Sequence, residues 1–123
     1  MPNLKATGLK TFIGSKNFDE SRDFYVALGC TLHADHGDLA ELEIGGSRFY
    51  LQNYYHRGWC NNSMLHLTVE SADAWYEHVT QLLAKRSYGK ARVKPPALQS
   101  YGATVTHVWD PVGILWHFAQ PSP

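Results

Sequence analysis

The sequence predicts an α+β fold in which two paired β-α-β-β-β modules form curved mixed sheets around a cleft. The first observation is that the same order of elements reads twice along the 123 residues. The second is a repeated pattern in the two predicted helices, where an acidic residue precedes an aromatic pair by the same spacing: Asp19 before Phe24-Tyr25, and Glu70 before Trp75-Tyr76. Neither unit alone buries both a helix face and a sheet face, so the two units pair. We expect a single domain over residues 1–123, with module one at about 1–58 and module two at about 59–123.

Module one begins with a predicted strand at residues 9–14, where β-formers lie between polar neighbours. A helix follows, because Asp19 can cap its start and Gly29 can end it. Gly45-Gly46 suits a tight hairpin turn. Three short strands are therefore expected after the helix, at residues 31–34, 39–44 and 48–53.

Module two repeats this order. A strand is predicted at residues 65–69 and a helix capped by Ser71 through residue 83. The chain ends in a hairpin of residues 104–109 and 114–118, because Asp110-Pro111 fixes the turn and Gly113 permits positive φ. Alternation along the last strand puts His117 on one face and Trp116 and Phe118 on the other.

Composition excludes several classes of function. Eleven Lys and Arg balance eleven Asp and Glu, and no basic run could follow a phosphate backbone, so we expect no nucleic acid partner. There is no apolar signal core and no apolar run of about 20 residues, so we expect no membrane and a cytoplasmic protein. Cys30 and Cys60 match no metal spacing and are expected to be free thiols. No Gly-x-Ser-x-Gly elbow or Walker spacing occurs, so neither a serine nucleophile nor nucleotide use is expected.

The sequence resembles the vicinal oxygen chelate superfamily of glyoxalase, bleomycin-resistance and extradiol dioxygenase proteins, most closely its bleomycin-resistance-like branch. Residues 17–29 read NFDESRDFYVALG, similar to the family pattern D-x-x-x-S-x-x-F-Y-x-x-L-G, with Asn17 in place of the acid. Further matches are HLTV at residues 66–69, YG at 101–102 and DPVG at 110–113. The resemblance implies paired modules, usually in a homodimer, whose concave sheets hold either a divalent metal or an organic ligand without metal.

The metal-ligand positions of these relatives distinguish the two cases. The resemblance places Lys10 at the first position, Tyr50 or Gln52 at the second, and His66 and His117 at the third and fourth. A lysine ammonium cannot donate to a cation, and Tyr or Gln replaces a carboxylate poorly. We therefore predict no metal and no other cofactor. The alternative is a divalent metal on His66 and His117, completed by water or by Glu41 or Glu43.

The family register also implies a ligand-binding surface of alternating residues. It mixes flat aromatic side chains with a few donors and acceptors, as expected for a planar or amphipathic molecule. The aromatic segment between the modules, which contains Tyr54, Tyr55 and Trp59, is expected to cover either this cleft or a dimer interface, and the sequence is compatible with both. The predicted ligand-binding residues are Lys10, Phe12, Tyr50, Gln52, His66, Thr68, Trp109, Leu115 and His117, and those of the segment are Tyr54, Tyr55 and Trp59.

The leading functional hypothesis is a metal-independent homodimer that sequesters a planar or aromatic, antibiotic-like small molecule. No catalytic residue is assigned. One alternative is a metal-dependent lyase, isomerase or dioxygenase that uses His66 and His117. Another is a metal-free enzyme in which one of these histidines acts as acid or base.

Overall fold

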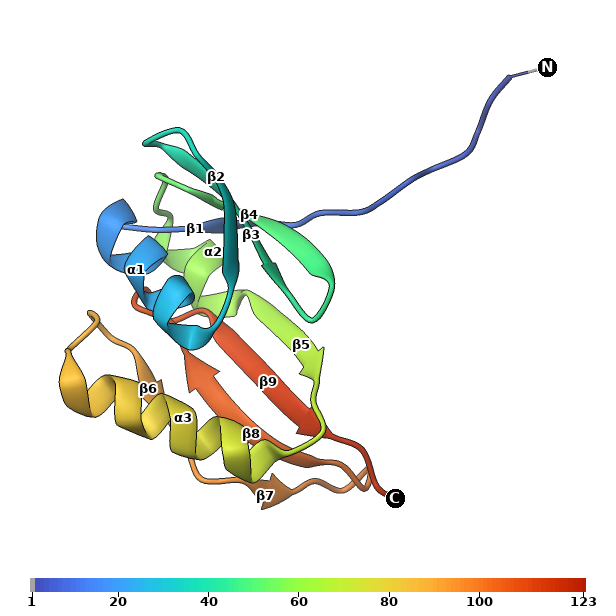
Figure 1. Ribbon diagram of the computed structural model, residues 1–123, viewed down its shortest axis with the longest axis vertical. Coiled ribbons are helices and arrows are strands. Elements are labelled where there is room, and N and C mark those ends of the chain that lie inside the picture. Colours follow the sequence, from blue (N-terminus) through green and yellow to red (C-terminus); the bar gives the residue numbers. More distant parts are fainter. Residues whose placement is uncertain (1) are drawn as a thin grey trace.

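Two mixed β-sheets and three helices make up the chain in the computed structural model, which describes residues 2–123 (Figure 1). The predicted α+β class with two sheet-forming modules is confirmed, and the second module has one strand more than predicted, in the order β-α-β-β-β-β. No helix among residues 2–123 is long and apolar enough to cross a membrane.

Module one folds around α1 (Phe18–Leu28) and a sheet of order β1-β4-β3-β2. Gly29, at φ 122°, ends the helix as predicted, but the cap at its start is Asn17, whose side chain accepts from the Glu20 backbone N–H. The prediction of Asp19 was wrong because Asp19 already lies inside the first turn. The strands are β1 (Phe12–Gly14), β2 (Thr31–Asp35), β3 (Leu39–Ile44) and β4 (Ser47–Gln52).

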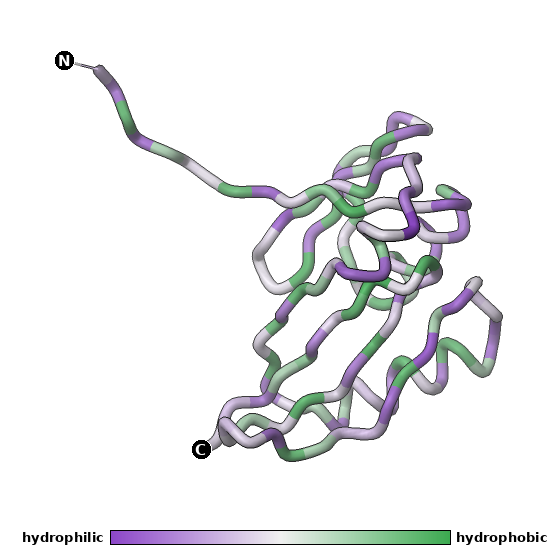
Figure 2. Tube along the Cα trace, turned by 180° about the vertical axis from the view of Figure 1, so that it is seen from behind, coloured by the Kyte–Doolittle hydropathy of each residue, from purple (hydrophilic) through white to green (hydrophobic). Residues whose placement is uncertain are grey.

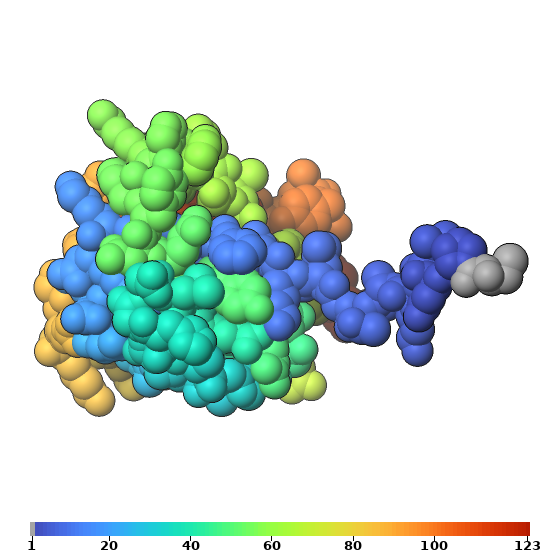
Figure 3. Space-filling model, turned by 90° about the horizontal axis from the view of Figure 1, so that it is seen from above, coloured from blue at the N-terminus to red at the C-terminus, as the bar shows by residue number. Residues whose placement is uncertain are grey.

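The first strand is shorter than residues 9–14, because β1 pairs only with β4, in parallel, from Phe12 onward. The residues before it extend away from the body as an arm (Figure 3). Within this arm Leu4 is 87% exposed and Leu9 is 95% exposed. The arm therefore leaves apolar side chains in solvent.

A helix, α2 (Arg57–Asn62), connects the two modules at a segment where no helix was expected from the sequence. Ser71 caps α3 (Ala72–Lys85) as predicted, accepting from the Ala74 N–H. The sheet has the order β5-β9-β8-β6, with β7 also paired to β8, and Lys94-Pro95-Pro96 separates β6 from β7. The strands are β5 (Met64–Thr68), β6 (Arg92–Val93), β7 (Ala97–Leu98), β8 (Thr104–Trp109) and β9 (Leu115–Gln120).

Each sheet buries one face and leaves the other open, as the alternation of hydrophilic and hydrophobic residues along its strands indicates (Figure 2). In β3, Ala40, Leu42 and Ile44 are buried while Glu41 and Glu43 between them are half-buried. The two helix-covered faces meet in one core that contains α1 and α3. The histidine ring of His78 on α3 contacts the carbonyl oxygens of Ala27 and Leu28 at the end of α1. The modules are thus packed with their buried faces inward.

A buried polar network joins the modules at the centre of this core. The Tyr25 hydroxyl donates to Asp110 Oδ2 at 2.6 Å, and Trp116 Nε1 donates to the Tyr25 oxygen at 3.0 Å. Asp110 Oδ1 accepts from the backbone N–H groups of Val112 and Ile114. Burial raises the pKa of Asp110 to about 6 against the opposing effect of these hydrogen bonds, and burial beside Asp110 raises the pKa of Tyr25 well above its usual value.

Replacing Tyr25 by Phe removes the hydroxyl that both Asp110 and Trp116 use, with almost no change in shape. We expect a loss of about 2 kcal/mol in the free energy of unfolding, because a buried carboxylate and a buried indole N–H each lose a partner. Urea unfolding measures it. The matched control is Tyr101→Phe, since Tyr101 is 66% exposed, and we expect it to change stability by less than about 0.5 kcal/mol. Equal losses in the two variants would contradict the central role of the network.

Candidate functional site

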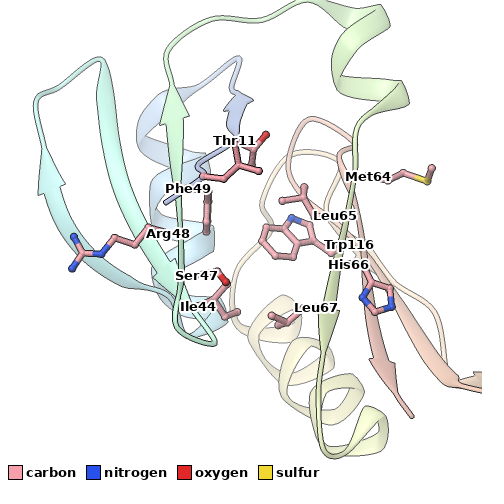
Figure 4. A pocket seen from close by; sticks show the side chains of 11 residues that line it. Thr11, Ile44, Ser47, Arg48, Phe49, Met64, Leu65, His66, Leu67 and Trp116 are labelled. Atoms are coloured by element: carbon pink, nitrogen blue, oxygen red, sulfur yellow. The ribbon is translucent and has the colours of Figure 1, made fainter. Parts of the chain in front are cut away.

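The sequence-predicted ligand residues lie on the open faces of both sheets, in two separate groups. Figure 4 shows Phe49 and Trp116 pointing into the space between the sheets, whereas Arg48 on one side and His66 on the other point away from it. The open faces therefore point in opposite directions, and one chain does not bring the two groups together. The first open face carries Lys10, Phe12, Tyr50 and Gln52, and the second carries His66, Thr68, Trp109, Leu115 and His117.

An aromatic stack is the main feature of the first open face. The rings of Phe12 and Tyr50, neighbours on β1 and β4, stack with centroids 4.8 Å apart at 28°, and Phe12 is 56% exposed. Lys10 Nζ lies 5.1 Å from the centre of the Tyr50 ring and 2.6 Å from Glu41 Oε2. The hydrogen bond with Glu41 raises the pKa of Lys10, and the same contact lowers the pKa of Glu41. Lys10 is therefore a fixed cation rather than a metal donor.

The carboxylates of this face are all engaged with basic side chains. Arg48 Nη1 is 3.4 Å from Glu41 Oε1, and Arg48 Nε is 3.6 Å from Glu43 Oε1. His33 Nε2 lies 2.6 Å from the same Glu43 oxygen. Glu41 and Glu43 belong to the first sheet, and the structure does not bring either of them to His66 and His117 on the second.

Three histidines form a row across the second open face. His66 on β5 and His107 on β8 are each the cross-strand partner of His117 on β9. The His107 and His117 rings have centroids 4.8 Å apart. His107 was not among the ligand residues predicted from the sequence. It lies two residues before Trp109 on β8, so strand alternation could have placed it on the same face.

Burial keeps two of these imidazoles neutral. Burial lowers the pKa of His107, and the neighbouring His117 and Lys94 lower it further. Burial also lowers the pKa of His117, with a smaller effect from His66. At neutral pH each ring therefore offers one N–H donor and one nitrogen acceptor.

Trp109 lies on the same face of the sheet, two residues after His107 on β8. Its cross-strand partner is Leu115, and its ring is roughly parallel to that of His107, with centroids 6.1 Å apart. The guanidinium carbon of Arg92, the β6 partner of Trp109, lies 3.6 Å from the centre of the Trp109 ring. The second open face thus has an aromatic and cationic stack beside its histidine row.

These residues do not fit a catalytic divalent metal centre. Among residues 2–123, no group of three or more His, Cys, Asp or Glu is placed to hold a metal ion. The strands of the second sheet contain neither Asp nor Glu, and its histidines run in a line across the sheet. Catalytic zinc sites ordinarily use three converging protein ligands.

The side chains of the aromatic segment between the modules differ in exposure. Tyr55 packs against the core, with Lys16 Nζ 5.6 Å from the centre of its ring. Tyr54 is 48% and Trp59 is 62% exposed, with ring centroids 5.7 Å apart, and His56 lies 4.6 Å from Trp59. Only Tyr54 and Trp59 therefore remain free to contact a ligand or a second chain.

A groove of about 360 Å³ with a mainly apolar lining lies between the two sheets (Figure 4). Its lining includes Phe49, Leu65, Leu67 and Trp116, and Leu9 of the arm borders it. Leu65 and Leu67 come from β5, which pairs on one side only. The groove is thus open along an unpaired strand edge.

Comparison with known proteins identifies the fold. No family model and no curated sequence matches the chain. A bleomycin-binding protein complexed with bleomycin superposes with a TM-score of 0.77 at 20% identity, over 95% of this chain and 100% of that one. A bleomycin resistance determinant encoded on transposon Tn5 gives 0.78 at 21% identity, over 95% and 100%. A glyoxalase/bleomycin resistance protein/dioxygenase from Nocardioides gives 0.74 at 17%, over 98% and 87%. The chain has the fold of this superfamily, as the sequence resemblance implied.

The histidine row can be tested by titration. We expect NMR to give a pKa for His107 below the ordinary 6.5, and we expect His117→Gln to raise it, because protonated His117 opposes protonation of His107 during the titration. The exposed His36 provides the matched control, and His36→Gln should leave the pKa of His107 unchanged. A His107 pKa at or above 6.5 would show that burial does not control this ring.

Proposed function

We propose that the protein is a homodimer that sequesters a planar, aromatic small molecule without a metal ion. The observation that carries this proposal is that each chain exposes two aromatic open faces pointing in opposite directions. An exposed stacked pair such as Phe12 and Tyr50 suits burial against a flat ligand. The bleomycin-binding protein complexed with bleomycin supports small-molecule binding by this fold.

The unpaired strand edges support the dimer. β1 pairs only with β4, and β5 pairs only with β9, so each sheet ends in an open edge. Open edges bordered by apolar surface readily accept another strand. A second copy that joins its first sheet to the second sheet of this chain would cover the groove and the exposed Leu9.

This arrangement would create two equivalent clefts by symmetry. One wall of each cleft would carry Phe12 and Tyr50 from one chain. The other wall would carry Trp109 and the histidine row from its partner. Each cleft would thus reunite the two groups of ligand residues that a single chain holds apart.

The donor set supports binding without a metal. The histidine row, with no carboxylate on the strands of its sheet, lacks the converging ligand set of a lyase, isomerase or dioxygenase centre. We place this binding protein in the cytoplasm and give it an antibiotic-resistance type of role. The free, buried thiols of Cys30 and Cys60 suit a reducing compartment.

Mixing two inactive variants tests the shared cleft. We expect Phe12→Ala and Trp109→Ala each to weaken binding of a planar probe, naphthalene-2-carboxamide, by about tenfold or more, because each removes one aromatic wall. Unfolding and refolding the two variants together should restore wild-type affinity in about one quarter of the clefts, since half of the dimers are mixed and each mixed dimer has one intact cleft. Isothermal titration calorimetry measures both numbers.

The control is each variant refolded alone, which should recover no tight sites. Recovery of none in the mixture, with dimers confirmed by sedimentation, would contradict a cleft shared between chains.

Elemental analysis tests metal independence. We expect untagged protein to contain no near-stoichiometric metal, before or after soaking in Mn, Fe, Ni and Zn, because His66 and His117 lack a third ligand. His66→Ala and His117→Ala serve as controls. A stoichiometric metal that both variants lose would instead favour the metal-dependent enzyme.

A further inference from the structure

The second open face has an excess of positive charge that no acidic side chain balances. The strands of its sheet hold Arg92 and three histidines but neither Asp nor Glu, and Lys94 follows β6 directly. The ion pairs among residues 2–123 involve other basic residues, and neither Arg92 nor Lys94 is among them. Those residues are Lys10, Arg22, His33, Arg48 and Arg86.

Arg92 is held in a defined orientation. Its guanidinium lies flat enough on Trp109 to place its central carbon 3.6 Å from the ring centre, while the residue stays exposed. Stacking on an indole uses one face of a guanidinium and leaves its N–H edges available. Such an edge matches the two oxygens of a carboxylate or a similar oxyanion in bidentate geometry.

Lys94 adds a second cation close to the histidine row. Its backbone N–H donates to the His107 carbonyl at 2.9 Å, so the chain still runs beside β8 at this point. The charge of Lys94 is near enough to His107 to affect that ring. Its amino group is exposed and has no carboxylate partner in the part of the chain that the structure describes.

The first open face differs, because its charges compensate one another. Lys10 contacts Glu41, and Arg48 contacts both Glu41 and Glu43. A cleft made from one face of each kind therefore derives its net charge from the second face. That charge is positive, and it lies beside neutral imidazoles that can donate hydrogen bonds.

We propose that the ligand is a planar anion, an aromatic molecule with a carboxylate or comparable oxyanion that pairs with Arg92 and Lys94. This inference rests on the proposed binding function and specifies the ligand class. The acidic group lies against the Arg92 edge, and the ring system lies between the histidine row and the Phe12–Tyr50 stack. Binding then offsets one of the two positive charges that Arg92 and Lys94 bring to the cleft.

The experiment uses three probes with the same ring and different charge: 2-naphthoate, naphthalene-2-carboxamide and 2-naphthylmethylammonium. Calorimetry at pH 7.5 and low salt should show naphthoate binding about tenfold more tightly than the ammonium. Raising the salt should reduce the preference, because screening weakens exposed charge pairs. Arg92→Gln should weaken naphthoate binding about tenfold and change amide binding less than about twofold.

Two further variants complete the design. Lys94→Gln should weaken naphthoate binding in the same direction by a smaller factor. Lys85→Gln removes another exposed lysine, at the end of α3, and should leave all three affinities unchanged. Both substitutions are on the surface, so the fold is retained.

The outcomes separate the two proposals. Equal affinity for the three probes, or an Arg92→Gln variant that weakens all three equally, would overturn the charge preference and leave the binding function standing. Preferential binding of the ammonium would do the same. Failure of every probe to bind saturably would overturn both proposals.

Discussion

The contact between Tyr25 and Asp110 is the constraint on which the arrangement of this molecule depends. It joins α1 of the first module to the turn after β8 of the second, across 85 residues of sequence. A buried carboxylate with three donors cannot move without leaving groups unpaired, so the modules keep one relative position. The raised Asp110 pKa of about 6 means that its contribution to stability is full at low pH and is lost as pH rises through about 6.

Because the helix-covered faces of the two sheets pack against each other, only the opposite, open faces are available for binding. Once α1 and α3 occupy the space between the modules, the two open faces must point outward and apart. The same packing leaves the edges of β1 and β5 without partners and leaves the groove beside β5 uncovered. In the proposed dimer, a second copy of the chain would cover the unpaired strand edges and would also bring the two open faces together.

Local patterns in the sequence were sufficient for most elements of the fold, because each depends on neighbouring residues. Ser71, Gly29 and the Gly45-Gly46 turn act where the sequence predicted. Alternation also indicated which candidate ligand residues share a face of their strand, as the strand registers show. The α2 helix was missed because His56, its cap, is not a usual capping residue, and its first turn has no acidic residue. Which faces pack together could not be read from alternation, because that depends on contacts such as Tyr25 with Asp110 and Trp116, far apart in sequence.

The charges of the second open face affect both metal binding and ligand binding. Arg92 and Lys94 lie beside the histidines that a divalent cation would need, and they would repel it. Enclosing the same surface in a cleft lowers the local dielectric, which strengthens that repulsion and equally strengthens attraction for an anion. The acidic residues that could have reversed this preference, Glu41 and Glu43, are committed to Lys10, Arg48 and His33 on the other sheet. A single asymmetry, carboxylates on one face and none on the strands of the other, therefore disfavours the metal centre and favours a negatively charged planar molecule.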